Sequence, residues 1–417
     1  MGHQAQVQQA PLYQPWHYGQ YPPVRTWATK PTWRAVVKGM VSYGMLSFLG
    51  LIVVSAITLV YGTSIVSPEI VHHSYPLYVV VPLIISIVTI SGTVLLAYYY
   101  LIVAAILASI LWFFLSGCKT YVSELRMKAK TREHSAIFDV AGLLFAYLFM
   151  STAIALLVML MGGDVEGLGE DLELWEMLFV LANASVWEEL VTRVLFVGLP
   201  LIMIHRISGG LRSKPHRYFV GGAFRMGRAE VALILASSVI FGFGHFAGGW
   251  GAWKILPTTI GGFAFGYIFL KHGLASAIVM HFGVDYMSMP ASVFESTAMD
   301  VLTVLIVFSW ICLGFVMSIY YISRMAEYVT GTRLLEPRPR AVPVMWTYPG
   351  WQAPQQWGRQ DPAATPPGWT NTPPQNAPPP QVTPPSPTWG FVCPNCGNVE
   401  ARWVEGRFQC LRCGYLS

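Results

Sequence analysis

Eight stretches of this chain are long and apolar enough to cross a lipid bilayer as helices. A hydrocarbon layer of roughly 30 Å takes about 20 residues of helix, and the backbone inside it must satisfy its own hydrogen bonds. Hydrophobic residues make up 54% of the 417 residues and charged residues only 11%, whereas a soluble domain carries about a quarter. We therefore predict an all-α fold, a polytopic transmembrane helical bundle, with spans near residues 41–62, 77–116, 136–161, 174–204, 230–248, 256–270, 274–290 and 301–323.

The charges of the loops predict the orientation of the bundle, because Lys and Arg concentrate in cytoplasmic loops. Residues 119–132 hold five Lys or Arg, residues 206–228 hold six and no acid, and residues 162–176 hold six acids and no base. Basic residues also flank the first and last spans. This pattern predicts a multi-pass integral membrane protein with a cytoplasmic N-terminus and C-terminal tail.

Segment 77–116 is unusually long, because as a single helix it would measure ~60 Å. It is either one helix that projects into solvent or two spans that turn at Ser91-Gly92. One crossing keeps the basic stretch 119–132 in the cytoplasm, so we count eight spans.

Three spans carry ionisable residues away from their ends, which is costly in lipid and indicates a functional site. One span carries Glu188, Glu189 and Arg193, the next carries His245, and a third carries His281 and Asp285. Glu189 and Arg193 are four residues apart, at ion-pairing distance on one helix face. Glu188 points about 100° away and has no local partner, which suits a general base. Together the group can activate water and stabilise an oxyanion, or it can bind a metal.

These residues fall into three ordered motifs, Glu188-Glu189-x-x-x-Arg193, Phe241-x-x-x-His245 and His281-x-x-x-Asp285. Over about residues 135–323 the chain resembles the CAAX protease and bacteriocin-processing family of intramembrane endopeptidases. The resemblance implies hydrolysis of a peptide bond near the C-terminus of a substrate. It also implies that Glu188 polarises the attacking water and that His245 holds this water. His281 and Asp285 would face the developing oxyanion. Glu189 and Arg193 would then fix the geometry.

The chain departs from the family pattern at two positions that matter. Thr192 stands where the family often has Phe. Asp285 stands where the prenyl-protein proteases have Asn, and an ionised Asp cannot donate a hydrogen bond to an oxyanion. It would have to be protonated, or else it binds something positive. The sequence therefore leaves open whether the water is activated by glutamate alone or by a metal.

The C-terminal tail carries two Cys-x-x-Cys knuckles, Cys393 with Cys396 and Cys410 with Cys413. Four thiolates at this spacing fit a closed, structural zinc site, and a cytoplasmic location argues against a pair of disulfides. We predict a zinc ribbon whose partner the sequence does not identify, with nucleic acid not expected.

These observations divide the chain into five parts. They are a disordered cytoplasmic segment (1–35), N-terminal transmembrane helices (36–134), a protease core (135–325), a Pro-rich linker (326–389) and the zinc ribbon (390–417). We expect an endopeptidase that uses glutamate-activated water to cleave a membrane-associated protein, with prenylated CAAX-like proteins as one class of substrate. The alternative is a non-catalytic membrane scaffold or immunity-type protein that recruits a partner through its ribbon.

Overall fold

The fold is described from a computed structural model, which covers residues 33–81, 83–126, 134–165, 172–211, 213–330, 401–404 and 407–410. The chain separates into two compact units, Met1–Arg338 and Pro339–Ser417. Most of the segment predicted as disordered, 1–35, and of the predicted Pro-rich linker, 326–389, lies outside the described residues. The exceptions are residues 33–35 and 326–330, which are helical and extend the first and last helices beyond the predicted boundaries.

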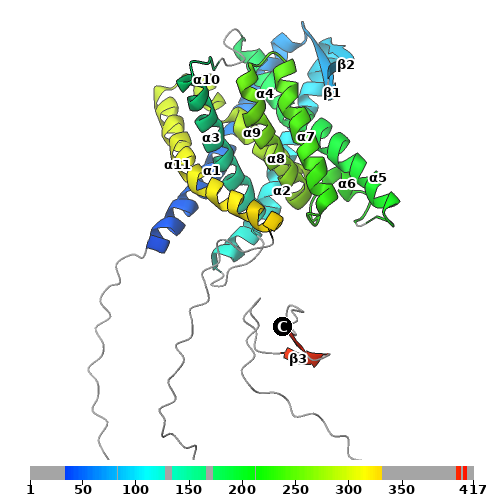
Figure 1. Cartoon of the computed structure of the whole chain (residues 1–417). Helices are drawn as coiled ribbons and strands as arrows, with labels where there is room; N and C mark the ends of the chain where they lie inside the picture. The colour runs from blue at the N-terminus through cyan, green and yellow to red at the C-terminus, as the bar shows by residue number, and fades with distance from the viewer. Residues whose placement is uncertain are drawn as a thin grey trace, which may run out of the picture. The chain divides into compact units, whose positions relative to one another are not determined.

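The first unit is a bundle of helices that run alternately between two ends (Figure 1). Its long helices are α1 (Trp33–Ile70), α2 (Gly92–Arg126), α3 (Ala136–Leu160), α7 (Arg228–Ala247) and α11 (Thr297–Thr330). A composite helix is formed by α4 (Leu174–Glu189), a π-helix η1 (Leu190–Gly198) and α5 (Leu199–Ile207). Shorter helices complete the unit: α6 (Arg217–Val220), the 3-10 turn η2 (Ala252–Lys254), α8 (Ile255–His272), α9 (Leu274–Tyr286) and α10 (Met289–Phe294).

Six helices among the described residues are long and apolar enough to cross a membrane, which confirms the prediction of a polytopic helical bundle. They are α1, α2, α3, the composite α4–α5 helix, α7 and α11. The other two predicted spans are the helices α8 and α9. Helix α9 has only 13 residues, about 20 Å by helical rise, and is therefore shorter than a bilayer is thick.

The centre of the bundle is α9, which contacts α1, α2, α3, α4 and α8. Nine of its 13 residues are buried. Helix α7 packs closely on α8 because glycines line their contact: a Cβ at Gly242 would lie 2.1 Å from Thr259 Oγ1, and one at Gly266 would lie 2.8 Å from Ile234. This close packing brings the ends of α7 and α9, which carry two of the three motifs, to the same end of the bundle.

Residues 77–81 and 83–91 form strands and not a helix, so both interpretations of segment 77–116 are wrong. An antiparallel hairpin of β1 (Ser74–Val81) and β2 (Leu83–Ser91) precedes α2, with a bulge between Leu77 and Tyr78. Its runs of Val, Ile and Thr favour strands, because branched side chains pack well on a pleated surface. Hydropathy alone does not separate such a hairpin from a helix. Helix α2 is then the one candidate crossing in this segment, as the loop charges required, but the described residues have six candidate spans and not the eight predicted.

In the second unit the structure describes one antiparallel pair of short strands, β3 (Ala401–Val404) and β4 (Arg407–Cys410). The pair lies between the two predicted cysteine knuckles, and its last residue is Cys410. Three of the four cysteines, Cys393, Cys396 and Cys413, lie outside the described residues. The zinc ribbon stays a prediction.

Candidate active site

The three motifs occupy three different elements that meet inside the bundle. Glu188 and Glu189 end α4, and Arg193 lies in η1 directly after them. His245 lies near the end of α7, and His281 and Asp285 lie on α9. Wide π-helical turns are rare and occur frequently at functional sites. The sequence does not reveal this one, because residues 174–204 have the hydropathy of a continuous helix.

Glu189 is the buried centre of the cluster. Its Oε2 accepts a hydrogen bond from Arg193 Nε at 3.1 Å, and its Oε1 accepts from His281 Nδ1 at 2.9 Å. The side chains of Glu189 and Arg193 are both fully buried. The predicted Glu189–Arg193 pair therefore forms, and it also holds His281, which the spacing of the sequence did not predict.

Arg193 is enclosed by groups that bind Nε and Nη1, while its Nη2 is buried without a hydrogen-bond partner among the described residues. Its Nη1 donates to Ser237 Oγ at 3.2 Å, and its guanidinium lies 5.5 Å and 5.7 Å from the ring centroids of Phe241 and Phe265. Ser237 in turn donates to the Thr192 carbonyl at 2.7 Å, so it ties α7 to the π-helix. Buried charges need such partners. The sequence analysis assigned no role to Ser237 or Phe265, because nothing in these residue types indicates a contact with Arg193.

Glu188 has a different environment from its neighbour. Its Oε2 is buried without a hydrogen-bond partner among the described residues, and it lies 3.7 Å from His281 Nε2. About a third of the Glu188 side chain, 33%, remains exposed. Thr192, where the family often has Phe, donates its hydroxyl hydrogen bond to the Glu188 carbonyl. Glu188 is thus a partly exposed side chain whose Oε2 is buried beside His281 without a hydrogen bond.

The His281 imidazole joins the three carboxyl groups. Its Nδ1 faces Glu189, its Nε2 lies 3.3 Å from Asp285 Oδ2, and its ring stacks on Phe265 with centroids 4.7 Å apart. Because Nδ1–H donates to Glu189, an attractive contact between Nε2 and Asp285 requires one further proton, carried either by the ring or by the carboxyl group. The arrangement can present a hydrogen-bond donor beside Glu188.

His245 lies next to this cluster and makes no hydrogen bond or ion pair with its other members in the described part of the chain. Its Nδ1 donates to the Phe241 carbonyl at 3.0 Å, which leaves Nε2 as the acceptor. The Phe241 ring lies between the two imidazoles, 4.6 Å from His245 and 6.1 Å from His281. Five of the six predicted residues therefore form one connected network, and the sixth faces it across Phe241.

The β-hairpin is attached to the helix that carries Glu188. Trp187 Nε1 donates to the Tyr78 carbonyl at 2.7 Å, and Asn183 Nδ2 donates to Tyr75 Oη at 3.3 Å. Burial raises the pKa of Tyr75 to about 12, and the nearby Glu188 charge acts in the same direction. Tyr75 therefore remains a neutral phenol close to Glu188. The hairpin was not predicted, so sequence reasoning missed this contact.

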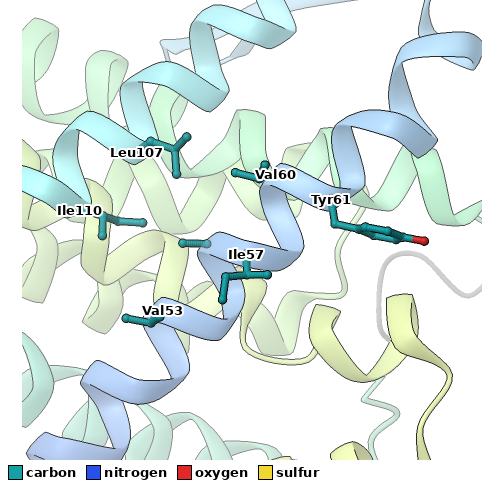
Figure 2. A pocket seen from close by; sticks show the side chains of 7 residues that line it. Val53, Ile57, Val60, Tyr61, Leu107 and Ile110 are labelled. Carbon is teal, nitrogen blue, oxygen red and sulfur yellow. The ribbon is translucent and has the colours of Figure 1, made fainter.

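Within the described ranges, no group of three or more His, Cys, Asp and Glu side chains has the geometry to hold a metal ion. A separate apolar groove of about 500 Å³ lies between α1 and α2 (Figure 2). It is lined by Val53, Ala56, Ile57, Val60, Tyr61, Leu107 and Ile110, and none of the candidate site residues borders it. Its lining offers no acid or base, so the chemistry belongs to the polar cluster.

Comparison with known proteins agrees with this geometry. The family model described as "Type II CAAX prenyl endopeptidase Rce1-like" matches residues 170–287, which span all three motifs and all six predicted residues. No curated protein and no solved structure matches the chain. Residues 170–287 of this membrane-embedded chain therefore belong to the CAAX prenyl endopeptidase family.

Proposed function

We propose that this protein is an intramembrane endopeptidase that hydrolyses a peptide bond of a membrane-associated protein with water activated by Glu188. The observation that carries the proposal is the free Glu188 oxygen beside His281, in a cluster where Glu189 is already bound by two donors. Prenylated, CAAX-like proteins are the substrate class that the family suggests.

In the proposed reaction Glu188 takes a proton from water, and the hydroxide attacks the scissile carbonyl carbon. The oxygen of that carbonyl becomes negative and receives hydrogen bonds from His281 or Asp285, whichever carries the shared proton. Glu188 then passes its proton to the departing amine, so that one peptide bond and one water yield a carboxylate and an amine. Nε2 of His245 is the group proposed to hold the attacking water.

We also propose a structural zinc ion in the tail, bound by Cys393, Cys396, Cys410 and Cys413. Four thiolates complete a tetrahedral zinc site and leave no position for a substrate. Its function would be to fold the short module, which has too few residues for a core of its own.

Mass spectrometry of host membranes tests the proposed function without knowledge of the substrate. Membrane proteomes are compared between cells that contain the wild-type protein and cells that contain Glu188→Ala. We expect proteins with shortened C-termini in the wild type that are full-length in the variant. Identical proteomes, together with partner proteins that co-purify through the tail in both strains, would favour the non-catalytic scaffold.

A further inference from the structure

The loop that joins α7 to α8 places a lysine beside the candidate active site. Trp250 N donates to the His245 carbonyl at 3.1 Å, and the rings of these residues are 6.3 Å apart. The Lys254 ammonium lies 4.3 Å from the Trp250 ring centroid and 5.2 Å from that of Trp253. Cation–π contacts of this kind hold the ammonium in place. Lys254 is thus fixed one aromatic ring away from His245.

The charge of Lys254 has no ion-pair partner within the described part of the chain. Asp285 is near enough to raise the pKa of Lys254, but burial has the larger effect and lowers it. Trp253 Nε1, in the same turn, is buried and donates no hydrogen bond to any described group. A half-buried cation and an unused N–H donor are both stabilised by an anion, since buried polar groups are costly without a partner.

Lys254 is also distinct in its location. Among the described residues it is the one Lys or Arg at the end of the bundle where α7 and α9 finish. The acids at this end include Glu69, Glu173, Glu176, Glu295 and Asp300, and the candidate site itself adds Glu188 and Asp285. An anionic group of a substrate would be repelled here unless it paired with this lysine.

We propose that Lys254 binds the free C-terminal carboxylate of the substrate peptide, on the leaving-group side of the bond that is cleaved. An extended chain advances about 3.3–3.6 Å per residue, so a terminus a few residues beyond the scissile bond can reach an ammonium beside His245. Lys254 would thereby select substrates by the position of their C-terminus. This inference rests on the proposed peptidase function.

Three versions of one candidate peptide separate the possible sources of the carboxylate. The first has a free C-terminus, the second has a C-terminal amide, and the third has the amide and a glutamate as its last residue. We expect the wild type to cleave the free acid with a KM about tenfold lower than that for either amide. An equal KM for the acid and the glutamate amide would overturn the assignment to the C-terminus.

The variants then assign the preference to Lys254. Lys254→Gln should cleave the acid and the plain amide with the same KM, and Lys254→Arg should keep the preference because it keeps the charge. Lys214→Gln, at an exposed position at the opposite end of the bundle, is the matched control and should behave as the wild type. Thermal unfolding checks that each variant is folded.

The outcomes distinguish this inference from the function on which it rests. If the wild type cleaves none of the three peptides, the proposed peptidase function fails, and the inference fails with it. If the peptides are cleaved and Lys254→Gln prefers the free acid as strongly as the wild type does, only the inference on Lys254 is refuted.

Discussion

Glu188 and Glu189 are adjacent in the sequence, but their contacts fit them for different tasks. Glu189 accepts hydrogen bonds from Arg193 and His281 and is fully buried. A carboxylate bound by two charge-assisted donors would have to break these bonds to take a proton. Glu188 has an oxygen with no such bond and is partly exposed. Among single residues, we therefore propose Glu188 as the base and Glu189 as the group that positions His281 and Arg193.

Asp285 offers a test of the shared proton. In Asp285→Asn the amide keeps a hydrogen-bond donor near His281, so we expect peptide cleavage within about tenfold of the wild type. In Asp285→Ala the donor is lost, and kcat should fall by about 10²–10³-fold, the usual effect of removing one donor to an oxyanion. Purified variants assayed on the same peptide give both numbers. An inactive Asn variant that has also lost a bound metal would instead make Asp285 a metal ligand.

Among elements, the sequence predicts those whose signal is local. Apolar runs reveal the helices, and the spacing of Glu189 and Arg193 reveals their ion pair. Sequence analysis does not identify the β-hairpin, because strands of Val and Ile have the same hydropathy as an apolar helix. The π-helix and the Ser237 contact are not identified for another reason: they depend on how α7 packs against η1, and no sequence periodicity records that packing. The hydrogen bond between His281 and Glu189 joins residues that are 92 positions apart.

Gly198, the last residue of the π-helix, tests how tightly this element is held. A Cβ at Gly198 would lie 2.0 Å from the Tyr218 carbonyl oxygen, so Gly198→Ala must push η1 away from α6. Overpacking of this kind costs about 1–3 kcal/mol. We expect a lower midpoint of thermal unfolding in detergent and reduced cleavage, because Arg193 lies in the same element.

The matched control is Gly50→Ala in α1, where a Cβ would meet nothing within 4 Å. Alanine is a better helix former than glycine by roughly 0.5–1 kcal/mol, so this variant should unfold at the same or a slightly higher temperature. Equal behaviour of the two variants would mean that the π-helix is not held against α6.

At the scale of the whole molecule, charge is distributed unequally between the two ends of the bundle. Described basic residues gather at the end where α2, α5, α8 and α11 finish, among them Lys119, Lys214, Arg217, Arg225, Arg228 and Arg324. The candidate site lies toward the other end, since His245 and Asp285 are near the last residues of α7 and α9. The positive-inside rule predicts that the basic end is cytoplasmic and that the site opens toward the opposite face.

Reporter fusions test this orientation. Fusions at Gly2 and Gly390 should report the cytoplasm, and a fusion at Gly167 in the acidic loop should report the opposite side, because positively charged loops are retained inside. A cytoplasmic reporter at Gly167 would reverse the side on which substrates approach the site.

Zinc content tests the second unit and the active site together. We expect one zinc per full-length chain and none in a chain truncated after Arg338, because all four predicted ligands lie beyond that residue. Elemental analysis of both purified proteins measures this. The truncated protein should still cleave peptide in the presence of a chelator. Cleavage that stops with the chelator and returns with added metal would place a metal at the Glu188 cluster.

The most direct test of the account is the cleavage rate of purified Glu188→Gln beside Glu189→Gln, with thermal unfolding of both. Glutamine keeps the size of Glu188 and cannot act as a base, so this variant should stay folded and lose about 10²–10⁴-fold in kcat. Glu189→Gln leaves the buried Arg193 charge without its ion-pair partner, so this variant should lose about 3–5 kcal/mol of stability together with activity. Wild-type cleavage rates in folded Glu188→Gln would contradict the account.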